Sequence, residues 1–151
     1  CTILNLILWN KGAENMERFL QQPCDPKQLS PLTLAFIGDA VFEVFVRERL
    51  VCQGNCSVNK LHKRAVEQVC CQSQAAAAQR LLPLLTQEEQ EAYRRGRNAH
   101  VTHVPKNADP ADYHAATALE TLFGYVYLKG ELDRLRLFFS VICGEEDVSP
   151  C

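Results

Sequence analysis

The chain has no excess of positive charge, no pattern typical of β-strands and no segment suited to crossing a membrane. Its 16 lysines and arginines are outnumbered by 18 aspartates and glutamates, so the formal net charge is −2 at pH 7. Any contact with a polyanion must therefore come from local basic patches. The apolar run from Pro31 to Val46 contains acidic residues and is shorter than the roughly 20 residues that a spanning helix needs. A buried helix that also contributes to a subunit interface explains this run better.

The absence of sustained period-two alternation favours an all-α fold of six or seven helices. Ser30 and Asp109 each precede a proline, as at many helix starts, and Thr86 and Glu89 have the spacing of a capping box. With 151 residues, 47% of them hydrophobic, we expect one globular domain. The expected helices span residues 16–22, 31–51, 58–71, 73–82, 87–98, 110–128 and 131–142.

The N-terminal stretch is unlike the rest of the chain. The sequence begins with Cys1, its only methionine is Met16, and the first nine residues are apolar without the features of a signal peptide. We expect residues 1–15 to be an extension, residues 16–145 to form the folded domain and residues 146–151 to be a loose tail. Nothing indicates secretion, so we expect a cytoplasmic protein.

Eight cysteines are many for this length, but their spacing is not a typical zinc motif. Cys52 and Cys56 are separated by three residues, and Cys70 and Cys71 are adjacent. We expect free thiols in a reducing compartment. A zinc site built from these four cysteines, in a helical regulatory protein, stays open as an alternative.

Two acidic residues, Asp39 and Glu120, lie where hydrophobic residues are expected. In helical register, each shares a face with apolar residues one turn before it and one and two turns after it. Burying an ionised carboxylate is costly unless a partner or a metal ion compensates it. The two faces comprise Ala35, Asp39, Phe42 and Val46 in one helix, and Ala116, Glu120, Phe123 and Tyr127 in the other.

A glycine accompanies each acid: Gly38 directly precedes Asp39, and Gly124 lies one turn after Glu120. Because glycine has no side chain, two helices can approach closely there and bring the carboxylates together. Two hard oxygen ligands suit Mg²⁺, with Mn²⁺ as a substitute. The alternative is that an arginine or a hydroxyl group neutralises each acid separately. No glycine-rich phosphate loop is present, and we expect no organic cofactor.

The segment from residue 92 to 108 contains no acid and several basic and amide side chains that can reach phosphates and ribose hydroxyls. Arg94 and Arg95 end a helix that begins with glutamates, where the helix dipole alone favours them. A second basic cluster spans residues 60–64, although a solvated helix face also explains such a cluster. The candidate substrate-binding residues are Lys63, Arg97, Asn98, Lys106 and Asn107.

Several segments together resemble the ribonuclease III family. LAFIGDAVFEVFVRERL, residues 34–50, resembles its signature helix, and ALETLFGYVYL, residues 118–128, resembles its second acidic helix. RGRNAH at 95–100 and PKNADPADY at 105–113 resemble more closely the Mini-ribonuclease III branch, which lacks a double-stranded-RNA-binding domain. The resemblance extends over about residues 29–139, and the remaining residues are too few for such a domain.

The resemblance implies a homodimeric, all-helical endonuclease that uses Mg²⁺ to cleave double-stranded RNA and matures the ends of 23S ribosomal RNA. By position, Asp39 and Glu120 match the catalytic aspartate and glutamate of the family. Family members usually carry further acids at positions that are Leu32, Ala35 and Thr117 here. Their absence keeps open an alternative, a catalytically inactive dimer of the same fold that holds RNA.

Overall fold

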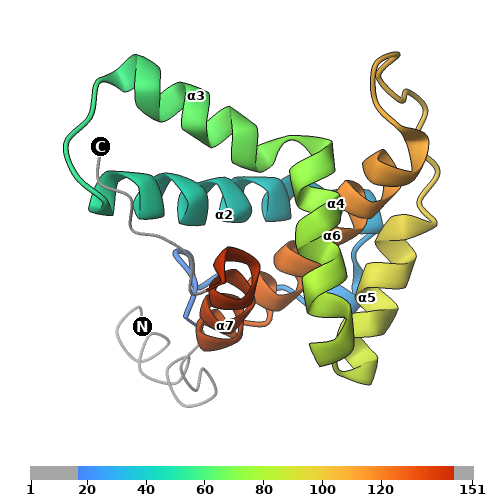
Figure 1. Ribbon diagram of the computed structural model, residues 1–151. Coiled ribbons are helices and arrows are strands. Elements are labelled where there is room, and N and C mark those ends of the chain that lie inside the picture. Colours follow the sequence, from blue (N-terminus) through green and yellow to red (C-terminus); the bar gives the residue numbers. More distant parts are fainter. Residues whose placement is uncertain (1–16, 145–151) are drawn as a thin grey trace, which may run out of the picture.

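The computed structural model describes residues 17–144, which form six α-helices, two short 3₁₀-helices and no β-strand. The helices are η1 (Pro26–Gln28), α2 (Pro31–Cys52), α3 (Val58–Val69), α4 (Cys71–Leu81), η2 (Leu82–Leu84), α5 (Gln87–Arg97), α6 (Pro110–Leu128) and α7 (Leu132–Cys143). The expected all-α fold is thus confirmed. As Figure 1 shows, α3 lies along α2 on one side of the molecule, while α4 and α5 pack around α6 on the other.

Local capping accounts for three helix starts, and all three were predicted. At α2, Ser30 Oγ accepts a hydrogen bond from the backbone N–H of Thr33 at 3.1 Å. The Asp109 carboxylate caps α6 in the same way. At α5, Thr86 and Glu89 make both hydrogen bonds of the capping box, 2.8 and 3.3 Å long. Each cap satisfies backbone donors that have no partner within the helix.

Two helix predictions need correction. Residues 17–22 are not helical, because their backbone bonds elsewhere: Phe19 N–H donates to the Tyr127 hydroxyl at 3.0 Å. The helix expected from residue 58 to 71 ends at Val69, where Cys70 adopts extended backbone, and α4 starts directly after it. The parts of the chain outside residues 17–144 are not described, so the domain boundaries at residues 16 and 145 stay predictions.

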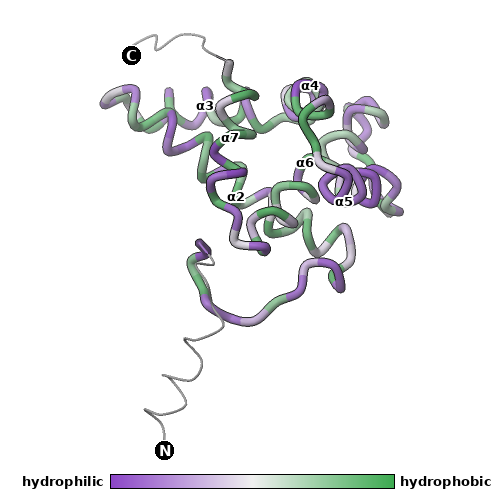
Figure 2. Tube along the Cα trace, turned by 90° about the horizontal axis from the view of Figure 1, so that it is seen from below, coloured by the Kyte–Doolittle hydropathy of each residue, from purple (hydrophilic) through white to green (hydrophobic). Residues whose placement is uncertain are grey.

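Helix α5 is the most hydrophilic of the described helices (Figure 2) and is anchored by an ion pair between the buried Glu89 and the partly buried Arg134. Glu89 is nearly inaccessible, and its carboxylate accepts hydrogen bonds from Arg134 of α7 at 2.7 and 2.8 Å. Burial alone would raise the pKa of Glu89, but the hydrogen bonds and charge of Arg134 outweigh it and lower that pKa. Glu89 is therefore an acid whose burial has a complete structural explanation.

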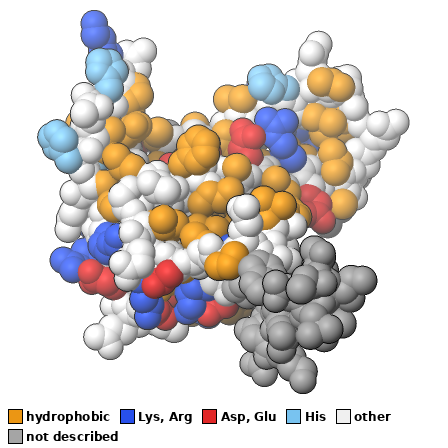
Figure 3. Space-filling model, turned by 180° about the vertical axis from the view of Figure 1, so that it is seen from behind, with side chains coloured by type: hydrophobic (Ala, Val, Ile, Leu, Met, Phe, Trp, Pro, Cys, Tyr) orange, Lys and Arg blue, Asp and Glu red, His pale blue; other side chains and the backbone are white. Residues whose placement is uncertain are grey.

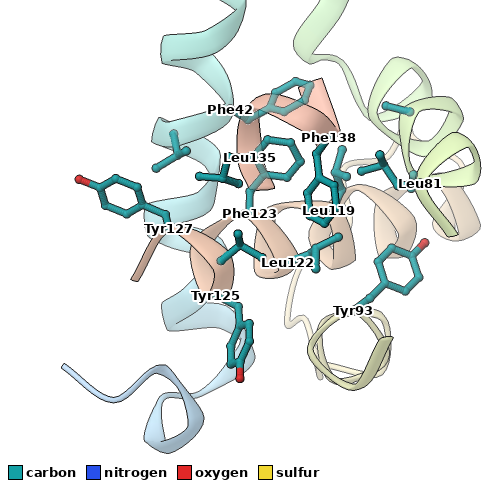
Figure 4. Packing of buried hydrophobic residues seen from close by; sticks show 14 of the residues in the cluster. Phe42, Leu81, Tyr93, Leu119, Leu122, Phe123, Tyr125, Tyr127, Leu135 and Phe138 are labelled. Carbon is teal, nitrogen blue, oxygen red and sulfur yellow. The ribbon is translucent and has the colours of Figure 1, made fainter. Parts of the chain in front are cut away.

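The hydrophobic core lies where α2, α6 and α7 meet, and Figure 4 shows their aromatic side chains turned toward one another. Phe42 of α2 packs edge-to-face on Phe123 of α6, with ring centroids 5.3 Å apart. Phe123 also contacts Phe138 of α7 at 6.1 Å. From Ala116 to Tyr127, every residue of α6 is buried except Glu120. A central helix that is covered almost all round along this stretch holds Glu120 firmly in place.

The two glycines next to the acids lie at the crossing of α2 and α6, as predicted. A Cβ atom added to Gly38 would collide with the backbone carbonyl of Glu120, and one added to Gly124 would collide with the carbonyl of Leu34. The two helices therefore touch backbone to backbone, which only glycine permits.

None of the described helices combines the length and the hydropathy that a membrane span requires.

Candidate functional site

A pocket of about 470 Å³ lies where α2, α6 and the loop before α6 come together, and both Asp39 and Glu120 line it. The close crossing of the helices thus places one carboxylate from each of them in the same pocket. The remaining wall is mostly hydrophobic. It comprises Leu32, Ala35, Phe36, Ile37, Ala40, Val101, Tyr113 and Thr117.

The two acids differ in exposure, and the expectation that both of them lie on buried helix faces is wrong for Asp39. Glu120 is half-buried, but Asp39 is exposed in the single chain. On the hydrophobic face of α2, Phe42 and Val46 are buried in the core, whereas Asp39 is exposed. Phe36, which lies almost one turn before Asp39, is also 84% exposed. The hydrophobic face of α2 therefore extends beyond the core of one chain.

Both carboxyl groups are harder to ionise than usual. Burial and the negative charge of Asp39 raise the pKa of Glu120 to about 7, against a smaller opposite effect of the Gln74 side chain. Although Asp39 is exposed, its partial desolvation by the pocket wall, and then the charge of Glu43, raise its pKa. A cation between the carboxylates would favour the charged forms and reverse both shifts. Two oxygen donors in a pocket open to a phosphate fit Mg²⁺, which commonly takes one or two carboxylates plus substrate oxygens.

Neither acid of the pocket is neutralised by a basic side chain of residues 17–144. Glu43, one turn after Asp39 on α2, does not line the pocket and is paired with Arg47 at 3.2 Å. The alternative in which an arginine neutralises each acid is thus not found here. Gln74 of α4 was not among the residues selected from the sequence, because α4 also contains Gln72 and Gln79 and no pattern distinguishes the three glutamines.

The zinc alternative does not fit the structure. In the described part of the chain, no three His, Cys, Asp or Glu side chains converge as metal ligands would. Free thiols are confirmed at Cys52, Cys70 and Cys71, while Cys56 is disulfide-bonded and departs from the expectation. The remaining free cysteines of the described range are Cys24 and Cys143.

Four of the five candidate substrate-binding residues lie at the end of α5 or in the loop that follows it. Arg97 and Asn98 end α5, and Lys106 and Asn107 follow in the loop before α6; all four are exposed. Lys63 is exposed on α3, far from this loop (Figure 1). Figure 3 shows hydrophobic side chains gathered in the hollow between α3 and the loop, with histidine and basic side chains at the tip of the loop. The structure thus presents two separate basic elements on either side of a hollow.

Arg94 and Arg95, the neighbours of this cluster, have structural partners. Arg94 forms an ion pair with Glu91 at 2.8 Å. Arg95 donates to the backbone carbonyl of Leu29 at 2.6 Å and so ties α5 to the start of α2. These contacts give both arginines a structural role, through partners that the helix-dipole explanation did not include. Arg97 is exposed at the end of α5 and stays a candidate for binding a ligand.

Known proteins resemble this chain over most of its length. The family model for the ribonuclease III domain matches residues 32–131. Mini-ribonuclease 3 from Symbiobacterium thermophilum is 51% identical over 111 residues, which are 74% of this chain and 85% of that protein. Mini-ribonuclease 3 from Thermoanaerobacter sp. is 46% identical over 108 residues, 72% and 76% of the two chains. The crystal structure of a protein from Fusobacterium nucleatum is similar with a TM-score of 0.72 at 25% identity, and covers 82% of this chain and 100% of its own.

Proposed function

The chain belongs to the ribonuclease III family and to its Mini-ribonuclease III branch, and it is an endoribonuclease; we propose that it cleaves double-stranded RNA in a reaction that depends on Mg²⁺. The substrate that we propose is the 23S ribosomal RNA precursor in the cytoplasm, as the resemblance to this branch implies. The observation that carries the proposal is the convergence of Asp39 and Glu120 in one pocket at the glycine crossing.

In this proposal, Asp39 and Glu120 hold a divalent cation between α2 and α6. The bound cation supplies Lewis-acid chemistry, which lowers the pKa of water and stabilises negative charge on the phosphate and the leaving oxygen. The two carboxylates would hold the cation at one point of a mostly hydrophobic pocket wall and would in this way set where a phosphate can dock. We propose that the hydrolysis leaves a 5′-phosphate and a 3′-hydroxyl.

A cleavage assay on a long RNA duplex tests the proposal directly. Purified protein should cut the duplex with Mg²⁺ or Mn²⁺ and not with EDTA. The rival function, an RNA-holding dimer without activity, is favoured by the lack of acids at Leu32, Ala35 and Thr117. Binding without cleavage at any Mg²⁺ concentration would support that rival. A 23S precursor offered beside an unrelated duplex of equal length then tests the substrate.

We further propose that the loop around Lys106 and the end of α5 bind RNA phosphates. Because the net charge is −2, binding must rest on a few local contacts and should be weak and sensitive to salt. Arg97→Gln and Lys106→Gln should each weaken duplex binding about threefold and lower the salt slope by about one. Titrations of a fluorescent duplex in EDTA at several salt concentrations measure both quantities.

Arg94→Gln is the matched control for these variants. It removes the same charge one turn earlier on α5, but Arg94 is already paired with Glu91. Its duplex affinity should stay close to that of the wild type. If all three variants lose affinity equally, only the overall charge matters and the assignment to the loop is wrong.

We also propose a homodimer that uses the uncovered face of α2. Phe36 is 84% and Leu32 is 43% exposed beside the pocket, and burying such side chains is favourable. Phe36→Glu should weaken dimerisation at least about 100-fold, because a charge would enter the apolar centre of the interface. Analytical ultracentrifugation measures this change. Phe19→Glu is the control, since Phe19 is equally exposed, at 83%, on a different surface. If Phe19→Glu is monomeric and Phe36→Glu stays dimeric, the interface does not lie on this face of α2.

A further inference from the structure

Gln74 is a buried amide whose donor has no partner. It lies on α4 and is only 2% exposed. Its Nε2 atom is shielded from solvent and makes no hydrogen bond with any residue of the described chain. A buried donor without a partner lowers the free energy of unfolding by about 1–3 kcal/mol. A hydrophobic side chain at this position would avoid this loss. Its neighbours on the buried face of α4, Ala75, Ala77 and Ala78, are all apolar, so Gln74 calls for an explanation.

The location of Gln74 provides that explanation. Helix α4 packs against α6, and the Gln74 side chain lies beside the Glu120 carboxylate. Glu120 is the single incompletely buried residue in the central stretch of α6. The unpartnered donor of α4 therefore lies beside the acid that lines the pocket.

A carboxylate that binds a metal ion must hold one oxygen toward it, and a donor on the other oxygen fixes that orientation. Loss of such a donor typically weakens metal binding or activity by about 10- to 100-fold. The orientation matters more here, because the pocket has only two acids. We propose that Gln74 is a positioning residue that holds the Glu120 carboxylate toward the divalent cation, an inference that rests on the proposed function.

Gln74→Met tests this role, since methionine has similar length and volume but no amide. The variant protein without RNA should bind Mn²⁺ about 10- to 100-fold more weakly, as measured by electron paramagnetic resonance of the free ion. Duplex binding in EDTA should not change. Its urea unfolding midpoint should equal or exceed that of the wild type, because an unsatisfied donor has been removed. Gln72→Met, at an exposed position of the same helix, should match the wild type in all three measurements.

Each result decides the inference. Mn²⁺ affinity of Gln74→Met within twofold of the wild type would overturn it, while cleavage by the wild type would leave the proposed function standing. If Gln74→Met does not fold, Gln74→Leu takes its place. A structural role would appear as a weaker Mn²⁺ affinity together with a lower urea midpoint in both Gln74→Met and Gln74→Leu. That result would also overturn the inference. If the wild type itself binds no Mn²⁺, the proposed function and the inference fail together.

Discussion

Asp39→Asn should lower the rate of duplex cleavage by at least about 10³-fold, which corresponds to roughly 4 kcal/mol of transition-state stabilisation. The substitution keeps the size of the side chain and removes one of the two charges that would hold the cation in the pocket. Because Asp39 is exposed, the fold should not suffer. Duplex binding should be retained or become tighter, since an anion that faces the phosphates is lost. Single-turnover cleavage with Mg²⁺ and a duplex titration in EDTA measure the two effects.

Glu43→Gln is the matched control for Asp39→Asn. It removes the same charge one turn later on α2, and Glu43 also raises the pKa of Asp39, but its carboxylate is paired with Arg47 and does not line the pocket. Cleavage should change less than about threefold, a free-energy difference of under roughly 1 kcal/mol. Equal losses in the two variants would mean that general electrostatics, and not a ligand role of Asp39, explain the first result. Normal turnover by Asp39→Asn would exclude Asp39 as a metal ligand.

Gly38→Ala should destabilise the fold by about 3 kcal/mol or more, at the upper end of what overpacking costs. The added methyl group would meet the backbone carbonyl of Glu120 and the backbone nitrogen of Gly124, and backbone atoms cannot move aside as a side chain can. The helices would have to separate, which also moves Asp39 away from Glu120. We therefore expect loss of cleavage together with a lower urea midpoint.

The sign of this stability change is diagnostic. Helix propensity alone would make alanine more favourable than glycine by about 1 kcal/mol, so a stabilised variant would show that α2 and α6 do not touch at this point. Gly96→Ala is the useful comparison on α5, because the added methyl group would meet the Thr121 side chain first and a single backbone atom, the Ala118 Cα, at 2.9 Å. Its effect on stability should be smaller, and cleavage should persist.

The features that sequence reasoning predicted correctly are those set within a few residues. The Ser30 and Asp109 caps and the Thr86–Glu89 capping box depend on side chains that bond to their own helix start. Local signals were insufficient for residues 17–22. Their expected helix does not form, and the backbone N–H of Phe19 donates to the Tyr127 hydroxyl of α6. They also did not show that Arg95 would reach Leu29.

The glycine next to each acid was the long-range signal in the sequence that held. It predicted the crossing of α2 and α6, because a glycine in the middle of a buried helix is costly unless another backbone lies against it. The exposure of Asp39 and the position of Gln74 beside Glu120 had no comparable signal. The exposure of Asp39 depends on how much of α2 its neighbouring helices cover, and the position of Gln74 depends on which side of α4 packs against α6.

By itself, the sequence determined the helical class, the helix starts and the choice of Asp39 and Glu120 as candidate ligands, since periodicity and capping act over one or two turns. Only the tertiary structure decided that these acids share one pocket and that the buried Gln74 amide lies next to Glu120. It also decided that Arg94 and Arg95 bind to structural partners. These outcomes depend on the packing of α2, α4 and α5 around α6. That packing brings together residues that are far apart in the chain, so no short-range sequence pattern determines its geometry.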